Sequence, residues 1–162
     1  MSLSKQAKTL TKPQIDAVLG YLANTRYPLR DRVIFLLSVK AGLRAKEIAS
    51  LTWAMVTDAE GALTDVISLT DIASKGRGGR VIPISKDLRV ALAALKVEAD
   101  TASRRSLFVI TTERESRTSS FAIVNKFAAW YRALGFSGAS SHSGRRTAVT
   151  QWVGRSQQSA DR

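Results

Sequence analysis

Three basic sites stand out in this sequence: Arg44, Lys75, and the pair formed by His142 and Arg145. His142 and Arg145 are three residues apart, so at the start of a helix both side chains can point the same way. Taken singly, each site also has a structural explanation. A lone histidine is more often a satisfied structural residue, and a lysine among glycines is ordinarily solvated. Arg145 and Arg146 could simply be surface cations that bind phosphate. What the sites share is an affinity for anionic groups.

The composition of the whole chain points the same way. It has 25 lysines and arginines against 13 acidic residues, a net charge of +12 and a pI near 10.7, which favours a polyanionic partner. Nucleic acid is the first candidate and an anionic membrane surface the second. The 162 residues suffice for one domain with a real core. There is no cysteine, secretory leader or membrane-length apolar run, so we expect a soluble cytoplasmic protein without disulfides.

The segment around Arg44 must form a sharp corner. An apolar run predicts a buried helix over about 29–40, and Gly42 just after it can adopt the left-handed conformation that ends helices. A second helix should follow at once, with Ile48 and Leu51 facing inward. Packing on both sides would then fix Arg44 in place. The alternative is a surface arginine that pairs with Glu47 one turn later.

The remaining segments predict an α+β fold that is mainly α. Residues 11–14 resemble a capping box that opens a helix ending near 24, and further helices are expected over 85–98, over 119–134 and after about 142. The helix over 119–134 should use one face for packing, formed by Phe121, Val124, Ala128 and Tyr131. Runs at 66–69 and 80–84 predict a small antiparallel hairpin whose loop carries Lys75. Residues 107–110 could be a strand or a buried connector.

In this order, three segments resemble the motifs of the tyrosine recombinases, the phage integrase family. Residues 41–53 (AGLRAKEIASLTW) resemble the first arginine motif of that family. Lys75 followed by RVIPI at 80–84 resembles its β-hairpin lysine, and HSGR at 142–145, followed by Arg146 and Thr147, resembles its His-x-x-Arg motif. The resemblance runs from about residue 10 to 153 and implies the helical integrase-like catalytic domain with its small sheet.

The resemblance also implies a function in DNA integration and recombination, by phosphodiester strand exchange on double-stranded DNA together with other recombinase protomers. Arg44 and Arg145 would clamp the phosphate, since two guanidinium groups, always protonated and able to donate two hydrogen bonds side by side, suit the equatorial oxygens of a phosphorane-like state. Lys75 would be the general acid for the leaving 5′ hydroxyl and His142 the assisting acid or base. Further DNA contacts would come from three arginines: Arg77, Arg80 and Arg146. No metal, nucleotide or other cofactor is implied, and the glycine-rich loop at 76–79 lacks nucleotide-binding spacing.

The sequence departs from the family pattern at the nucleophile. That residue is a tyrosine further along the family's chain, but every tyrosine here precedes the His-x-x-Arg motif: Tyr21, Tyr27 and Tyr131. Trp152 comes too soon to match the family's second histidine or tryptophan. We therefore expect residues 11–162 to be a catalytic domain incomplete at its C-terminus, after a basic arm or linker remnant at 1–10. This chain alone should form no covalent DNA adduct. The alternative is a non-catalytic DNA-binding module derived from a recombinase.

A smaller departure concerns Gly144, which stands where the family commonly has an apolar residue. A missing side chain at this position predicts looser packing beneath Arg145.

Overall fold

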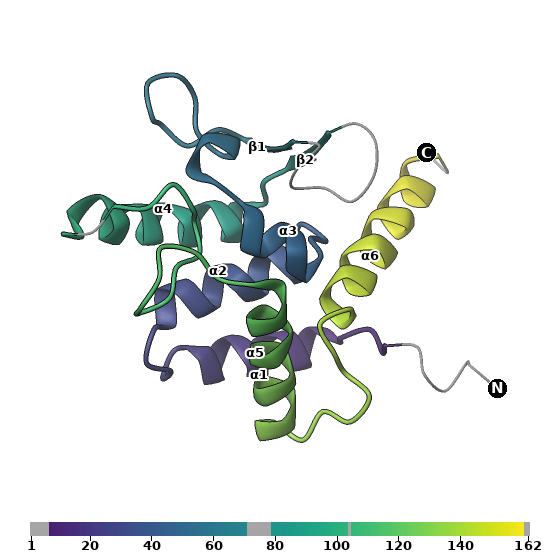
Figure 1. The fold of residues 1–162 in the computed structure, drawn as a ribbon. Helices are drawn as coiled ribbons and strands as arrows, with labels where there is room; N and C mark the ends of the chain where they lie inside the picture. The colour runs from purple at the N-terminus through teal and green to yellow at the C-terminus, as the bar shows by residue number, and fades with distance from the viewer. Residues whose placement is uncertain (1–6, 71–78, 104, 161–162) are drawn as a thin grey trace.

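The fold is known from a computed structural model that describes residues 7–70, 79–103 and 105–160, the last three without side chains. Helix α2 (Pro28–Val39) runs through the middle of the domain, between α1 (Lys12–Leu22) and α4 (Lys86–Thr101) (Figure 1). The short helix α3 (Ala45–Ser50) follows α2, and α5 (Ser120–Ala133) and α6 (Ser143–Ala160) complete the helical part. The strands β1 (Val66–Leu69) and β2 (Arg80–Pro83) lie at one end, after a 3-10 turn at Trp53–Met55.

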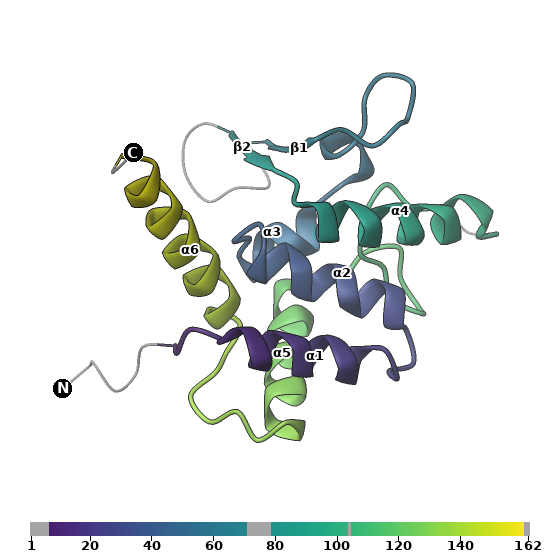
Figure 2. The same cartoon turned by 180° about the vertical axis from the view of Figure 1, so that it is seen from behind.

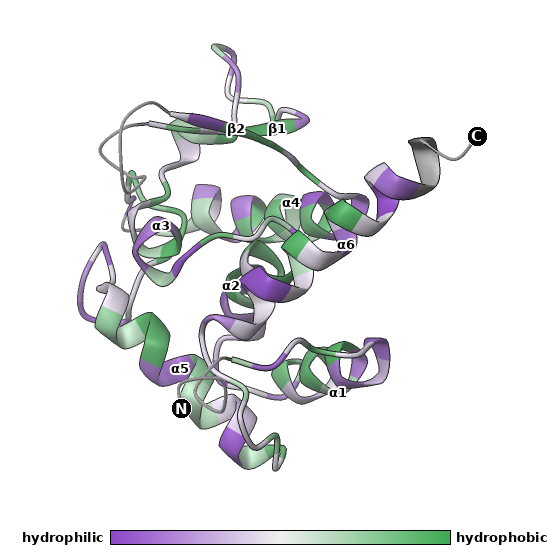
Figure 3. Cartoon of the chain, turned by 90° about the vertical axis from the view of Figure 1, so that its right-hand side faces the viewer, coloured by the Kyte–Doolittle hydropathy of each residue, from purple (hydrophilic) through white to green (hydrophobic). Residues whose placement is uncertain are grey.

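Helix α2 forms the centre of the core because it is apolar around most of its circumference. All seven residues from 33 to 39 are buried, and Figure 3 shows the other helices arranged around it. The helix expected over 29–40 is confirmed. The capping box of α1 is confirmed as well: Thr11 Oγ1 accepts from the Gln14 N–H, and Gln14 Oε1 accepts from the Thr11 N–H.

The two strands form the small antiparallel sheet that the sequence predicts. Val66 pairs with Pro83 at one end and Leu69 with Arg80 at the other, and the paired Ile67 and Ile82 are both buried. The side chains of β1 and β2 therefore cover the core from one face only. The tip of the hairpin, including Lys75 and Arg77, lies outside the described residues.

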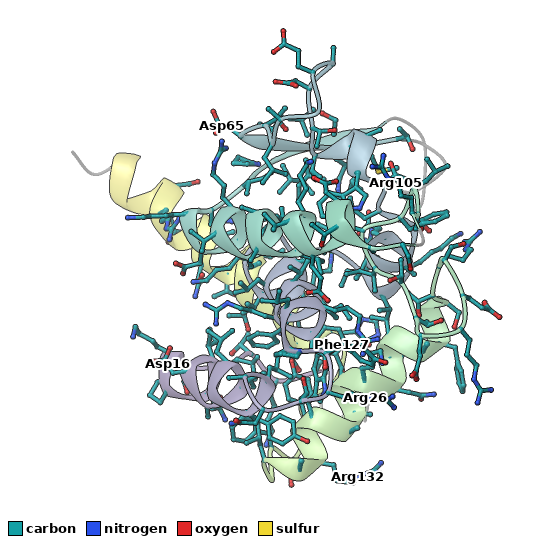
Figure 4. The ribbon with its side chains drawn as sticks, turned by 90° about the vertical axis from the view of Figure 1, so that its left-hand side faces the viewer. Asp16, Arg26, Asp65, Arg105, Phe127 and Arg132 are labelled. Atoms are coloured by element: carbon teal, nitrogen blue, oxygen red, sulfur yellow. The ribbon has the colours of Figure 1, made fainter. Side chains whose placement is uncertain are left out.

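In the second half of the chain one expectation needs revision and one open alternative is resolved. The packed face of α5 is formed by Ile123, Phe127, Trp130 and Tyr131, so of the predicted residues Tyr131 is confirmed and the other three are wrong. Phe121 is instead 73% exposed and Val124 39% exposed. Two apolar stripes overlap on this helix, and the buried stripe is the one that contains Phe127 and Trp130. Figure 4 shows Phe127 between the helices. Residues 107–110 form a connector with a single antiparallel bridge, between Thr52 and Phe108.

The first part of α6 makes most of its packing against the domain, and Trp152 adds a contact with the turn at Gly42. Gly144, Thr147 and Ala148 are buried, whereas residues 149–157 are all exposed. Seen from behind, the helix leans away from α2 toward the hairpin end of the molecule (Figure 2). Within the described ranges, no helix combines the length and the apolar character that crossing a membrane requires.

Candidate functional site

The corner between α2 and α3 fixes the backbone of Arg44. Gly42 adopts the left-handed conformation with φ of 69°, as its sequence position predicts, and its N–H donates to Ser38 O at 3.0 Å. The next N–H, that of Leu43, reaches back to Leu37 O, also at 3.0 Å. Arg44 then caps the start of α3 in an extended conformation. Its side chain thus leaves the backbone at a point held by α2 on one side and by α3 on the other.

The buried side chain of Glu47 links the backbone at this corner to strand β2. Its side chain is only 1% exposed, and its Oε1 accepts a hydrogen bond of 2.9 Å from the backbone N–H of Arg44. The guanidinium of Arg80, from β2, donates to the same oxygen at 2.9 Å. Arg80 Nη2 is also 2.9 Å from Oε2, which is within ion-pair distance, although Oε2 has no directed hydrogen bond among the described residues. The surface pairing of Arg44 with Glu47 is therefore wrong, because the ionic partner of Glu47 is Arg80.

Arg145 reaches the same corner from the first turn of α6. Its Nη1 donates a hydrogen bond of 2.8 Å to Gly42 O, across a separation of 103 residues in sequence. The helix can approach α2 this closely because residue 144 is glycine. A Cβ at Gly144 would lie 2.1 Å from Ser38 Oγ, so a larger residue would push α6 outward. The looser packing expected from Gly144 is therefore wrong: the glycine allows closer packing.

The charges at this corner are unbalanced. Burial lowers the pKa of Arg145, and the neighbouring charges of Arg44 and Arg80 lower it further, while Glu47 opposes them. Two neighbouring guanidiniums thus act on that of Arg145, close to the buried carboxylate of Glu47. Because that carboxylate is engaged by Arg80, the arrangement favours an added anion near Arg44 and Arg145.

A cleft of about 470 Å³ opens beside these groups, between the turn at Gly42, strand β2 and helix α6. Arg80 and Arg145 contribute its polar wall, and Trp152 closes one side. The indole ring also approaches the Gly42 backbone, since a Cβ there would lie 3.2 Å from the ring. The site therefore combines fixed cations with an accessible, partly apolar hollow.

The other predicted residues are placed as follows. His142 is exposed and immediately precedes α6, with its backbone carbonyl accepting from the Arg146 N–H at 3.1 Å. Arg146 is exposed on the first turn of α6, next to Arg145. Lys75 and Arg77 lie outside the described residues. The structure thus brings together Arg44, Arg80 and Arg145, and it places His142 one turn before Arg145.

Sequence reasoning missed the role of Glu47. The available signal was its position, three residues after Arg44 at the start of a helix, where a glutamate side chain commonly returns to the capping N–H. Its second partner, Arg80, is 33 residues away and could not be found from local spacing.

The fold and the site define a mainly helical domain with a small antiparallel sheet and a cleft lined in part by arginines. The sequence profile described as the Phage integrase family matches residues 8–157, and this chain belongs to that family. No curated protein matches the chain significantly.

Several solved structures share the fold. The XerA recombinase is 13% identical with a TM-score of 0.70, and the match covers 91% of this chain and 51% of that one. The Tn1549 transposon integrase in complex with circular intermediate DNA is 18% identical with a TM-score of 0.67, covering 91% and 52%. A lambda integrase dimer bound to a COC′ core site is 18% identical with a TM-score of 0.66, covering 88% and 40%. The chain spans about half the length of the first two proteins.

Proposed function

We propose that this chain binds double-stranded DNA and clamps one backbone phosphate between Arg44 and Arg145, as the catalytic domain of a site-specific tyrosine recombinase. The observation that carries the proposal is the convergence of these two arginines, from distant segments, at a corner where the buried carboxylate of Glu47 is engaged by Arg80. Membership of the phage integrase family supports it. A phosphate would supply the missing negative charge.

The geometry suits phosphoryl transfer. The Gly42 carbonyl accepts from Nη1 of Arg145, and this hydrogen bond fixes the orientation of the planar guanidinium and therefore of its other N–H donors. A guanidinium anchored before the substrate arrives, as that of Arg145 is, stabilises charge on the non-bridging oxygens with little reorganisation, and Arg44 would add its charge from a backbone position held at the corner. In this proposal Lys75 protonates the leaving 5′ hydroxyl and His142 assists as acid or base. Arg77 and Arg146 add DNA contacts, and Arg80 contributes through Glu47 as well as by its charge.

The partners follow from the same reasoning. The Tn1549 integrase is described in complex with DNA, and lambda integrase as a tetramer bound to a Holliday junction. We propose duplex DNA as the partner of this chain, with further recombinase protomers assembled on it. The net charge of +12 supports an affinity that falls steeply with salt.

A second candidate, DNA binding without catalysis by these residues, is favoured by the tyrosines. Tyr131 is only 1% exposed within α5, and burial raises its pKa, which is the opposite of what a nucleophile needs. Tyr27 contacts Arg26 and Arg30 at the turn between α1 and α2, and Tyr21 lies on α1. A nicked suicide substrate separates the two candidates, because only a catalytic chain accumulates a covalent 3′-phosphotyrosyl adduct.

The clamp itself is tested by Arg44→Ala and Arg145→Ala. Fluorescence anisotropy with a labelled duplex at several salt concentrations should show weaker binding and, for each variant, a salt dependence reduced by about one unit per lost phosphate contact. Arg132→Ala is the matched control, since Arg132 is exposed near the far end of α5 (Figure 4). Equal affinities and slopes in both clamp variants and the control would contradict the proposal.

A further inference from the structure

We propose that Thr147 is a positioning residue for Arg145, acting by tying the first turn of α6 to the segment that precedes α1. Thr147 is 3% exposed, and its single hydroxyl makes two hydrogen bonds. It accepts from the backbone N–H of Leu10 at 2.8 Å and donates to the carbonyl of Ser143 at 2.7 Å. One side chain thereby joins segments that are 137 residues apart in sequence.

The segment at residues 8–10 is held at a second point. The backbone N–H of Lys8 donates to Gly138 O at 3.2 Å, in the loop that leads into α6. The aliphatic part of the Lys8 side chain covers Gly138, where an added Cβ would lie 2.9 Å from Lys8 Cε. Leu10 is 6% exposed and belongs to the core. The two views of the ribbon agree that this segment passes beside the start of α6 (Figures 1 and 2).

The first turns of α6 are therefore held by two contacts. Thr147 meets the backbone of Leu10, and Gly144 meets Ser38 of α2. Arg145 lies between these two contacts in the sequence and must reach Gly42 O at 2.8 Å. Residues 149–157 are all exposed to some degree, so beyond these turns the helix packs mainly through the partial contact of Trp152 with the Gly42 turn. A tilt of the first turn would move Arg145 away from the corner.

A threonine suits this role because its hydroxyl both donates and accepts. Thr147→Val keeps the shape but leaves the Leu10 N–H and the Ser143 carbonyl without that hydroxyl, whereas Thr147→Ser retains it. If Thr147 only stabilised the fold, its removal would lower the melting temperature without changing the contact between Arg145 and Gly42. The positioning role predicts that this contact changes in the folded protein.

The contact can be followed in the free protein by NMR. The amide of Leu43 belongs to the peptide group whose carbonyl is Gly42 O, so its chemical shift reports on the hydrogen bond from Arg145. Arg145→Ala defines the shift when the bond is lost. We expect Thr147→Val to move the Leu43 signal toward that value, Thr147→Ser to leave it near the original, and Thr150→Val, an exposed threonine on the same helix, to leave it unchanged.

A second variant perturbs the segment at residues 8–10 without changing any residue of α6. Lys8→Pro removes the N–H that binds Gly138 O, and it should move the Leu43 signal in the same direction as Thr147→Val. An unchanged Leu43 signal in folded Thr147→Val, or in folded Lys8→Pro should the first variant not fold, would overturn the proposal.

The consequence for DNA rests on the proposed phosphate clamp and is measured separately. Thr147→Val should weaken duplex binding about tenfold, the loss expected when a charge-assisted hydrogen bond is impaired. Combined with Arg145→Ala it should add little, because both changes act through the same guanidinium. If Arg145→Ala leaves DNA affinity unchanged while the Leu43 signal still responds to Thr147→Val, the clamp is wrong and the positioning role stands.

Discussion

The pair formed by the buried Glu47 and the partly exposed Arg80 should be a sensitive ionic contact of this fold. We expect Glu47→Gln to lower the free energy of unfolding by about 1–3 kcal/mol. Breaking a fully buried ion pair costs about 3–5 kcal/mol, but the Arg80 side chain is 33% exposed and water recovers part of the loss. The amide oxygen of glutamine can still accept from the Arg44 N–H, so the cap of α3 is retained and the change isolates the charge.

Urea unfolding at neutral pH, followed by circular dichroism, measures this difference. The control is Glu113→Gln, which removes the carboxylate from the exposed pair with Arg26, where both side chains are more than half exposed. That change should cost less than about 1 kcal/mol. A double-mutant cycle of Glu47→Gln with Arg80→Met should give a coupling energy of about 1–3 kcal/mol. Additive effects, or a loss no larger than that of the control, would refute the view that this carboxylate organises the corner.

Two further predictions concern glycines. Gly144→Ala should destabilise the fold by about 2 kcal/mol or more because its Cβ would lie 2.1 Å from Ser38 Oγ, and Ser38→Ala should restore part of that loss in thermal unfolding. Gly154 lies on the same helix, and a Cβ added there would have no atom within 4 Å, so Gly154→Ala should be neutral or stabilising by up to about 1 kcal/mol. Equal effects of the two changes would contradict the close approach of α6 to α2. Gly42→Ala should cost more than Gly61→Ala in the same assay, since both have positive φ but only Gly42 also has α6 side chains within 4 Å; equal costs would show that strain alone matters at Gly42.

Local patterns were sufficient for most of the fold. A continuous apolar run can only be a buried element, and a glycine at its end supplies the turn, so α2 and the corner at Gly42 were predictable. The face of α5 was not. Phe121 and Val124 form a stripe with helical spacing that is as apolar as the one containing Ile123 and Phe127, and period alone does not choose between them. The choice depends on which stripe meets α3 and the rest of the core.

The candidate site was predictable only in part, for a related reason. Spacing identified Arg44 and Arg145 as members of motifs, and the resemblance to the integrase family suggested that they meet. The contacts that hold them are non-local. The bond from Arg80 to Glu47 and the close approach of Gly144 to Ser38 depend on distances between elements, which one sequence does not encode in any local pattern. Lys75 and Arg77 stay predictions, as do the roles of His142 and Arg146.

The arrangement of charges is difficult to explain as a purely structural ion network. In such a network each cation would approach a carboxylate, but among the described residues the one buried carboxylate near the corner binds Arg80 and the Arg44 backbone, and Arg145 rests on a carbonyl. Bringing Arg145 partly out of water beside two like charges opposes folding, as its lowered pKa indicates. A fold that maintains such a cost at the edge of an open cleft is typical of a binding site prepared for a charged ligand. In the function proposed above, a DNA phosphate would offset the repulsion that the arginines exert on Arg145.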